Sequence, residues 1–360
     1  MLPYLSKHDA VSLDAQKQRD FLQSMGHKAL LYAELYDNDV AELAKDFDRA
    51  KEALQDKKNI LIYHHCVYWA QGEELLRQSP AKFILRYHSI TPEKYFVSYD
   101  RASFIACLEG RKQTLRIIQK KNLSQLMCTS SYTQKEIEEW NIQKKPSFVV
   151  APAHDLESHI HSKACVETSK QLQSSKKLKI LFVGRIVPHK NIEGILDSIE
   201  RYMQRFGTNC EAHISGSFCL EDQSYYRQLS KKVNTLGISS FVHFHSRTSL
   251  SKLIALYKHC DIFMTLSHHE GFGVPILEAQ YHKLPVCSWN VAAIKETCGP
   301  KQLVFDENSP EIFAQTMHRL QHDSELKKYL IEQGKQNYQR FEQEKIQQNF
   351  ALCLEGKTHV

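Results

Sequence analysis

Two glutamates, Glu270 and Glu278, frame the stretch of the sequence that is best suited to chemistry, HHEGFGVPILEA at residues 268–279. Between them, Gly271 and Gly273 would let a ligand approach the backbone closely. Glu278 has an ordinary alternative explanation, because the helix dipole favours a carboxylate in the first turn of a helix. Glu270 stands directly before Gly-Phe-Gly, where no structural role is evident. We therefore predict that it contacts a ligand.

A metal site is the first alternative for this stretch. His268, His269 and Glu270 all carry possible ligand atoms. Adjacent residues point in different directions, however, and no further ligand follows at the usual spacing. The sequence therefore predicts no metal site.

A second stretch, FVGRIVPHKN at residues 182–191, carries two cations. Arg185 directly follows a strand-like run, and Lys190 stands where the next helical pattern begins. Fixed cations at a strand end, beside a helix N-terminus, can hold a diphosphate. Two solvated basic residues in a loop are the alternative. Both stretches follow strand-like runs, and ligands of open α/β sheets bind beyond the carboxyl ends of the strands.

The elements that must position these residues are clearest in the second half of the chain. Short runs rich in Ile, Val, Leu and Phe alternate there with segments of helical period, which is typical of a parallel, doubly wound sheet. We expect strands at 176–186, 210–217, 241–247, 260–267 and 284–289, with helices at 191–206, 222–236, 249–259 and 274–283.

The first half repeats this alternation less clearly. We expect strands at 28–34, 59–66, 81–90, 124–130 and 147–152. A helical pattern at 9–26 begins almost at once and leaves only MLPYL for a strand before it. The first strand of this half is therefore expected to be short or missing. A polar segment at 154–179 resembles a linker with one short helix, and the pattern is helical from Ser309 onward.

Composition limits the function classes. The chain has 360 residues, enough for two domains, and its net charge of +6 is too mild to indicate nucleic-acid binding. No apolar run approaches the roughly 20 residues of a spanning helix, and the first residues do not resemble a secretory signal. Ten cysteines without a Cys-x-x-Cys pair are typical of reduced thiols in a cytoplasmic protein.

Several motifs of the second half occur in the order and spacing of one enzyme family. SHHEGFGVPILEAQYHKLPV (267–286) resembles the S-x-x-E-G-F-G-x-P-x-x-E-A signature, followed by G-x-P-V, of the family 4 (group 1) retaining glycosyltransferases. VGRIVPHKN resembles their phosphate motif, and FHSRTSLSKLIALYKHCDIFMTLS resembles the stretch before the signature. Lys283, Ser246 and Cys260 depart from the family pattern. The resemblance covers about residues 176–300.

The first half resembles a bacterial subgroup of this family that makes surface polysaccharides or lipopolysaccharide. LIYHHC…ILRYHSITPEKYF (61–96), EGRKQTL and TSSYTQKEIEEW carry that likeness, with Ser89 in place of the usual asparagine. HDAVSLD (8–14) resembles the first loop of the subgroup, but His8 and Ser12 stand where glycines are usual.

The resemblance implies the GT-B fold, with two Rossmann-like, doubly wound domains facing each other across a cleft. It implies an acceptor-side domain at 1–165, a nucleotide-sugar-binding domain at 166–340, and a C-terminal helix at 341–360 that returns to the first domain.

It also implies roles for individual residues. Arg185 and Lys190 would neutralise the donor diphosphate, Glu270 would contact the sugar, and Glu278 would accept hydrogen bonds from the ribose. His88 would contact the transferred sugar, with a strand-end structural histidine as the alternative, and Asp9 would lie near the acceptor. The remaining donor-binding positions are Gly184, Arg247, Thr248, Gly271, Phe272, Gly273 and Val274.

The expected function is retaining transfer of a hexose from a GDP- or UDP-sugar to a hydroxyl of a glycan or lipid-linked glycan, in lipopolysaccharide or exopolysaccharide synthesis. Neither a metal nor another cofactor is expected, and nucleic acid is not an expected partner. An inactive sugar-nucleotide-binding subunit and a nucleotide-sugar epimerase of the same fold are the alternatives. A basic helix at 110–121 could rest on the cytoplasmic membrane face, although a solvated helix face would look the same.

Overall fold

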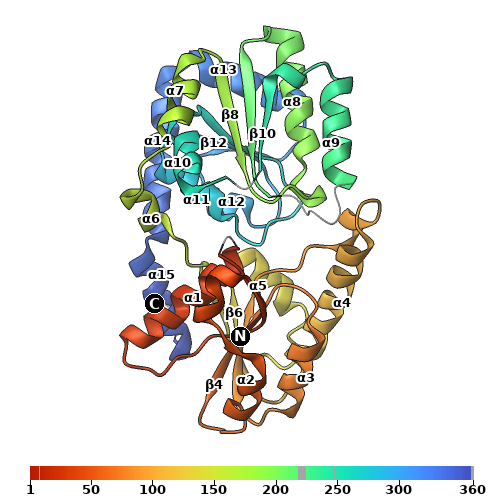
Figure 1. Ribbon diagram of the computed structural model, residues 1–360, viewed down its shortest axis with the longest axis vertical. Helices are drawn as coiled ribbons and strands as arrows, with labels where there is room; N and C mark the ends of the chain where they lie inside the picture. The colour runs from red at the N-terminus through yellow and green to blue at the C-terminus, as the bar shows by residue number, and fades with distance from the viewer. Residues whose placement is uncertain (8, 218–223, 247, 358–360) are drawn as a thin grey trace. The chain divides into compact units, whose positions relative to one another are not determined.

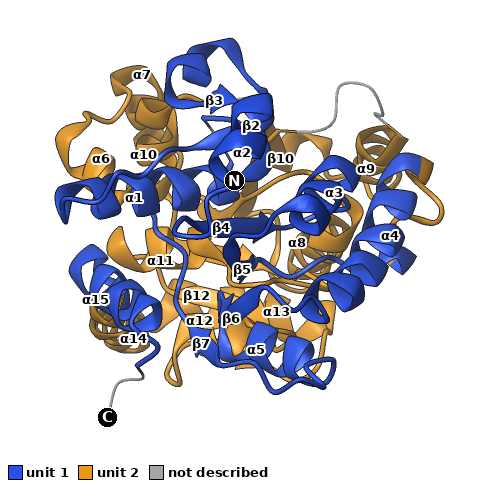
Figure 2. Cartoon of the chain, turned by 90° about the horizontal axis from the view of Figure 1, so that it is seen from below, with its two compact units in different colours: residues 1–94, 102–154, 341–360 blue, residues 95–101, 155–340 orange. Residues whose placement is uncertain are grey.

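The computed structural model describes residues 1–7, 9–217, 224–246 and 248–357. Two compact units make up the chain (Figure 2). Unit 1 contains residues 1–94, 102–154 and 341–360, and unit 2 contains 95–101 and 155–340. This division differs in two places from the expected one: the boundary falls after His154 instead of residue 165, and the short segment 95–101 belongs to unit 2.

Unit 2 is built on a six-stranded parallel sheet, as expected for a doubly wound domain (Figure 1). Its strands run in the order β10-β9-β8-β11-β12-β13, so the order reverses between β8 and β11, at a topological switch point. Five of the strands were predicted, and β13 was not. The strands are β8 (Leu178–Val183), β9 (Cys210–Ser215), β10 (Val242–His245), β11 (Ile262–Thr265), β12 (Val286–Trp289) and β13 (Leu303–Phe305).

Helices cover both faces of this sheet, which explains why its central strands are continuously apolar. One face packs against α8 (Ile192–Phe206), α9 (Ser224–Thr235) and α13 (Pro310–His322). The other packs against α7 (Val166–Ser174), α10 (Leu250–His259), α11 (Val274–Tyr281) and α12 (Ile294–Cys298). The helices α6 (Leu156–His161) and α14 (Ser324–Tyr338) complete the unit.

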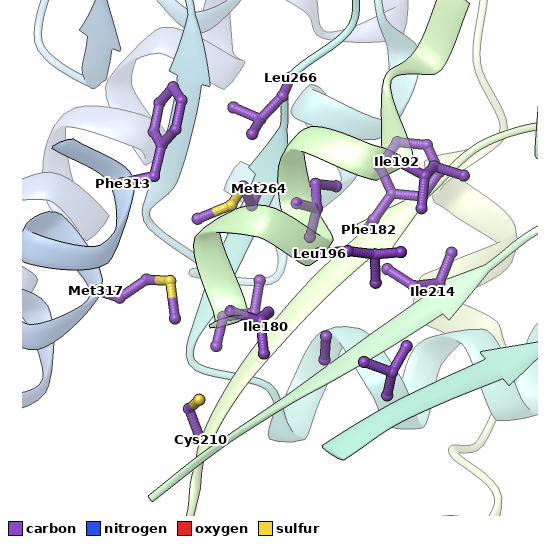
Figure 3. Close-up of a cluster of buried hydrophobic side chains, with 14 of the residues drawn as sticks. Ile180, Phe182, Ile192, Leu196, Cys210, Ile214, Met264, Leu266, Phe313 and Met317 are labelled. Atoms are coloured by element: carbon purple, nitrogen blue, oxygen red, sulfur yellow. The ribbon is translucent and has the colours of Figure 1, made fainter. Parts of the chain in front are cut away.

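Alternation along β8 divides the core between the two faces. Ile180 and Phe182 point toward α8, and Leu181 points toward the opposite face. Figure 3 shows Ile180 and Phe182 gathered with Ile192 and Leu196 of α8. Full burial of such side chains stabilises the fold by roughly 1.5–3 kcal/mol each. This packing fixes the strand whose carboxyl end carries Arg185.

Unit 1 contains two parallel sheets, β1-β2-β3 and β4-β5-β6-β7. The Met1 amino group donates to Ile62 O (2.8 Å) and His64 N donates to Met1 O (2.9 Å), so β1 lies beside β4. The first strand, expected to be short or missing, is present and has four residues. The strands are β1 (Leu2–Leu5), β2 (Tyr32–Tyr36), β3 (Lys45–Asp46), β4 (Ile60–His65), β5 (Lys82–Tyr87), β6 (Leu123–Cys128) and β7 (Ser147–Val149).

The helices of unit 1 include the one expected at 9–26, which spans α1 (Ala10–Ser24). The C-terminal helix expected at 341–360 is α15 (Gln343–Leu354), which a 3₁₀ turn at Gln339–Phe341 separates from the end of α14 at Tyr338. The other helices are α2 (Phe47–Ala53), α3 (Ala70–Gln78), α4 (Arg101–Ile118) and α5 (Ser131–Glu138). In the described parts of the chain, no helix has the length and apolar character needed to cross a membrane.

Candidate functional site

The loop after β8 depends on a close backbone approach. Gly216, just beyond β9, lies so near this loop that a Cβ on it would stand 1.7 Å from Gly184 O. Only glycine fits there, and Gly184 N donates to Ser215 O (3.0 Å). This contact aligns the ends of the two strands. Arg185 follows with an exposed guanidinium that makes no hydrogen bond or ion pair with the described residues.

Lys190 and Glu270 form an ion pair. Lys190 Nζ lies 2.5 Å from Glu270 Oε1, and both side chains are largely buried, at 15% and 12% exposed. Ser267 Oγ donates to the same carboxylate oxygen (2.8 Å). The two residues that the sequence assigned to the phosphate and to the sugar are therefore in direct contact. A ligand at this position would meet a paired cation and anion whose positions are already fixed.

Asn191 connects the loops that carry this pair, a role that the sequence analysis missed. Its backbone is left-handed, with φ 50°. Its Oδ1 accepts from Gly194 N (3.2 Å) and caps α8, and its Nδ2 donates to Leu266 O (2.9 Å). A second bond runs from His268 N to His189 O (2.7 Å). Asparagine tolerates this conformation. An asparagine at the expected helix start was therefore the sequence feature that could have indicated this role.

The start of α11 shapes the glycine-rich segment. Gly273 has φ +100°, a conformation that favours glycine. Pro275 lies in the first turn, as its fixed φ favours. The carbonyl of Phe272 accepts from Thr297 Oγ1 (2.7 Å), and that of Glu270 accepts from Ala293 N (3.2 Å). These contacts hold the segment on α12, where the sequence predicted a ligand.

Glu278 is half-buried on α11. Tyr257 of α10 donates its hydroxyl to Glu278 Oε2 (2.6 Å). Burial raises the pKa of the Glu278 carboxyl, and the bond from Tyr257 opposes that shift. Tyr257 was not identified from the sequence, because its spacing also fits an ordinary core residue of α10. A hydrogen bond from a neighbouring helix therefore orients the carboxylate, and a favourable position in the helix dipole does not account for that bond.

Thr248, expected to bind the donor, lies between β10 and α10. Its Oγ1 bonds Ser215 Oγ (2.8 Å) and donates to His245 O (3.2 Å), so it joins the ends of β9 and β10. Arg247, also expected to bind the donor, lies outside the described residues.

The segment 95–101 brings aromatic side chains to the same loops, which the sequence did not indicate. Tyr95 stacks on His268 with ring centroids 5.3 Å apart and planes 4° apart, and its hydroxyl donates to His268 O (3.3 Å). Phe96 contacts His189 edge-on at 5.7 Å. His268 and His189 therefore have aromatic neighbours in unit 2.

Unit 1 holds a second cluster around His88, just beyond the end of β5. His88 Nε2 lies 3.0 Å from Nδ1 of His64, on β4. Asp14 of α1 places its Oδ2 3.8 Å from His88 Nε2 and 4.0 Å from His64 Nδ1. Arg86 Nε donates to the same carboxylate oxygen (2.8 Å). Of this cluster the sequence analysis identified only His88.

Both imidazoles of this cluster are neutral at ordinary pH. Burial lowers the pKa of His88 well below its usual range, and Arg86 adds to the shift. Burial likewise lowers the pKa of His64, with the chain amino group, His88 and Arg86 as further causes. In the bond between the two rings, one nitrogen donates and the other accepts. The tautomers of His64 and His88 are therefore coupled.

Asp9 caps the N-terminus of α1. Its Oδ2 accepts from Ser12 N (2.9 Å) and from Ser12 Oγ (3.0 Å). Ser12, which stands where the resembling subgroup has glycine, also accepts from Ser6 N through its hydroxyl (3.0 Å). Asp9 thus has a structural role besides the acceptor contact that the resemblance implies.

Two further motifs of the first half meet at Glu136 of α5. Its carboxylate accepts from Arg111 Nη1 (2.7 Å) and from Ser89 Oγ (2.9 Å). Arg116, on the helix expected to be basic, pairs with Glu73 (2.8 Å). With Lys112, which pairs with Glu109 (2.9 Å), three cations of the segment 110–121 therefore have acidic partners within unit 1.

Most of unit 2 matches a known protein family. Residues 167–337 match the model for glycosyl transferases group 1. The segment is similar to O-antigen chain mannosyltransferase B of Escherichia coli, with 27% identity over 44% of this chain and 41% of the relative. It is also similar to the capsular polysaccharide biosynthesis glycosyltransferase CapM of Staphylococcus aureus, with 26% identity over 43% of this chain and 39% of the relative. The chain thus matches about two fifths of the length of these relatives.

Solved structures resemble the whole chain. Anabaena Alr3699/HepE in complex with UDP-glucose superposes with a TM-score of 0.74, at 14% identity over 99% of both chains. WaaG, a glycosyltransferase involved in lipopolysaccharide biosynthesis, gives a TM-score of 0.69, at 13% identity over 99% of this chain and 100% of that one. Likeness at this identity concerns the fold.

Proposed function

From the premise that the chain belongs to the group 1 glycosyl transferases, through residues 167–337, and has the GT-B fold, we propose that it transfers a hexose from a nucleotide sugar to a hydroxyl acceptor. The observation that carries this proposal is the arrangement at the strand ends of unit 2. Arg185 and the Lys190–Glu270 pair follow the two strands between which the sheet order reverses. Ligands of open α/β sheets bind at such a point.

The donor diphosphate would lie against these cations. Arg185 is exposed and carries an unpaired guanidinium among the described residues, which suits a bidentate phosphate contact. Lys190 is held by Glu270 and would stabilise the charge that grows on the leaving diphosphate. With protein cations in this role, we propose that transfer needs neither a metal nor another cofactor, and that it retains the anomeric configuration.

Glu270 and Glu278 would receive hydroxyl groups of the donor. Glu270 already shares one oxygen with Lys190 and Ser267, and its other oxygen would accept from the sugar. Glu278 gives one oxygen to Tyr257 and would accept a ribose hydroxyl on the other. Hydrogen bonds to carboxylates are stronger than those between neutral groups. The Glu278 contact would strengthen binding of any nucleotide with a ribose, and the Glu270 contact would favour a sugar nucleotide over a simple nucleotide.

Relatives suggest the class of donor and acceptor. The Anabaena protein was solved with UDP-glucose, and the Escherichia coli relative is named as an O-antigen mannosyltransferase. We propose a UDP- or GDP-hexose as donor and a growing surface glycan, free or lipid-linked, as acceptor, in lipopolysaccharide or exopolysaccharide synthesis on the cytoplasmic side. His88 of unit 1 would contact the transferred sugar.

Peripheral membrane contact is a separate part of this proposal. Arg111, Lys112 and Arg116 pair with Glu136, Glu109 and Glu73. Lys120 and Lys121 are therefore the cations of the segment that would offer charge to an acidic surface. Sedimentation with vesicles containing anionic lipid, compared with neutral vesicles, tests it. Equal sedimentation with both would remove membrane contact from the proposal.

Thermal-shift measurements against a panel of UDP- and GDP-hexoses test donor binding. A donor that binds only the folded chain raises its melting temperature by mass action. Arg185→Ala should abolish most of that rise. An unchanged rise in this variant contradicts the diphosphate assignment.

Product formation separates an enzyme from an inactive donor-binding subunit. We expect the chain to hydrolyse or transfer the sugar of its preferred donor, and Glu270→Ala to stop the reaction. Tight donor binding with no turnover, with or without acceptor glycan, would support the binding subunit instead. Inversion of a sugar centre on the free nucleotide would indicate an epimerase.

A further inference from the structure

The face of the unit 2 sheet beneath α7 and α10 carries an unusual group of polar residues. Glu211 and His213 alternate along β9, and His243 and His245 alternate along β10. The strands are parallel, and His213 is the register partner of His243. All four side chains therefore project from one face, at the edge of a sheet whose central strands are apolar. None of these residues has a role in the proposed transfer reaction.

Three of them converge on one point. His213 Nε2 lies 3.5 Å from Glu211 Oε1, and His243 Nε2 lies 3.9 Å from Glu211 Oε2. The ligand atoms of the three side chains all lie within 4.8 Å of one another. Small rotations would bring them to the separations found around one bound metal ion.

His213 is oriented by a fourth residue. Its Nδ1 lies 3.0 Å from His245 Nε2, and the two rings stack 14° from parallel. This bond leaves His213 Nε2 turned toward Glu211. Metal-binding histidines usually make such a bond through the nitrogen that does not bind the metal, which fixes their tautomer.

The other nitrogen of His213 makes no close hydrogen bond, because its nearest polar neighbour, Glu211 Oε1, lies 3.5 Å away. His213 is only 6% exposed, and among the described residues its buried Nε2 has no hydrogen-bond partner closer than that carboxylate. Buried polar atoms are nearly always paired, because leaving one unpaired costs free energy. A ligand between His213 and Glu211 would satisfy this atom.

There is room for such a ligand. A pocket of about 330 Å³ opens against Glu211, His213 and His243, with Lys177 and Thr168 among its other lining residues. Lys179, the buried register partner of Glu211, donates its Nζ to Lys177 O (3.0 Å). Lys177 Nζ stands 3.9 Å from Glu211 Oε2 on a side chain that is 35% exposed. It can move into solvent when another cation binds.

In a comparable cluster of unit 1, the neighbouring cation is buried and cannot move into solvent. Asp14, His64 and His88 also bring three ligand atoms together. There, however, Arg86 is fully buried and donates to the Asp14 oxygen that faces both histidines. A metal ion would meet a fixed positive charge, so this cluster is a hydrogen-bonded network and a poor metal site.

We propose that Glu211, His213 and His243 bind one divalent transition-metal ion of the Zn²⁺, Co²⁺ or Ni²⁺ type, with His245 as the residue that orients His213. Two imidazoles and one carboxylate suit these ions, and Mg²⁺ and Ca²⁺ prefer oxygen ligands. Three protein ligands leave a position for water from the pocket. The ion would connect the edge strand β10 to β9 and stabilise unit 2.

Competition titration of the full-length, metal-stripped, untagged chain with Zn²⁺ against a chromophoric chelator tests this site. We expect one tightly bound equivalent and a rise in melting temperature with Zn²⁺, with no rise at equal concentrations of Mg²⁺. His243→Gln and Glu211→Gln should weaken binding by roughly 100-fold or more, and His245→Gln by roughly 10–100-fold.

Controls distinguish this site from adventitious binding by a chain with 19 histidines. His27 is exposed and outside the cluster, so His27→Gln should bind Zn²⁺ as the unaltered chain does. His243 is 40% exposed, so its substitution leaves the fold intact, which circular dichroism in chelator would verify. No tight Zn²⁺ equivalent in the unaltered chain, or equal binding by His243→Gln and Glu211→Gln, overturns the proposal.

Discussion

Lys190 Nζ and Glu270 Oε1 are 2.5 Å apart, in an ion pair that joins the loop after β8 to the loop after β11. Each residue is the other's charge partner before any ligand arrives. The pair therefore stabilises unit 2 and also forms part of the proposed donor site. Substitutions can separate its effect on stability from its effect on transfer.

Lys190→Met should leave the Glu270 carboxylate buried without its cation. We expect a loss of about 1–3 kcal/mol in the free energy of unfolding, with a similar loss in Glu270→Gln. The double variant should recover part of the stability, because it removes both charges. Transfer should fall by roughly 100-fold or more in all three. Urea denaturation and a transfer assay measure the two effects, and additive stability losses in the double variant would contradict the coupling.

Arg185→Gln should behave differently from Lys190→Met. The Arg185 guanidinium is exposed and contacts no described residue through a hydrogen bond or ion pair. We therefore expect a change in unfolding free energy within about 0.5 kcal/mol, together with a large loss of donor affinity. Calorimetric titration with the preferred donor measures that affinity. Wild-type affinity in this variant would show that the diphosphate binds elsewhere.

Tyr257→Phe should change the pH dependence of donor binding. The Tyr257 hydroxyl lowers the raised pKa of Glu278, so its removal raises that pKa further. The protonated carboxyl loses an acceptor oxygen for the ribose, and affinity therefore falls as the pH falls through this pKa. We expect the acidic decline in affinity to begin at a higher pH in the variant than in the unaltered chain.

Tyr225→Phe is the matched control for that experiment. It removes a similar bond from tyrosine to a half-buried glutamate, Glu193, outside the proposed site. Its pH profile of donor affinity should match that of the unaltered chain. The same profile in Tyr257→Phe and Tyr225→Phe would argue against Glu278 as a ribose acceptor.

His65 should make the stability of the chain pH-dependent. Burial lowers the pKa of His65 to about 4, against smaller opposing effects of Gly110 and Glu73. The unfolded chain therefore binds the proton more readily between pH 6.5 and 4, and stability falls as the pH falls through this window. For this one residue the loss between pH 7.5 and 5 is about 2 kcal/mol.

His65→Gln removes the titrating group and keeps a donor for Thr114, which His65 contacts at 2.8 Å. Its loss of unfolding free energy between pH 7.5 and 5 should be smaller than that of the unaltered chain by about 2 kcal/mol. Urea denaturation at the two pH values measures the difference. An identical loss would mean that His65 does not titrate as a buried neutral imidazole.

Two substitutions at Asp9 separate helix capping from catalysis. Serine is also a good helix cap, so Asp9→Ser should keep the stability of unit 1, whereas Asp9→Ala should lose about 1 kcal/mol. If the carboxylate acts on the acceptor side, both variants lose transfer activity to a similar extent. Full activity in Asp9→Ser would restrict Asp9 to its capping role.

Local patterns predicted most of unit 2. Alternating apolar strands and helical segments placed β8 to β12 within a few residues, because a sheet buried on both faces needs continuous apolar runs. The short edge strand β13 lacked such a run and was missed. In unit 1, the pattern left only five residues before α1, yet β1 forms there because it pairs with β2, and Met1 also bonds with β4.

The residues named as site candidates came from motifs, spacing and family resemblance. The residues that contact these candidates were not predicted, because such contacts depend on distance in space and not on position along the chain. Nothing in the sequence near Glu278 indicates Tyr257, and nothing near His88 indicates Asp14 or Arg86. The group of Glu211, His213 and His243 was missed for the same reason, because parallel pairing of β9 and β10 brings it together.

The sequence by itself determined which strand ends carry the candidate charges, because the strands, their order along the chain and the glycines at their ends are local properties. Only the tertiary structure decided that Lys190 faces Glu270, that Tyr257 holds Glu278, and that His64 couples to His88. These contacts depend on strand order and helix packing. Burial then sets the charge states, because a group's pKa follows from the side chains that surround it once the chain has folded.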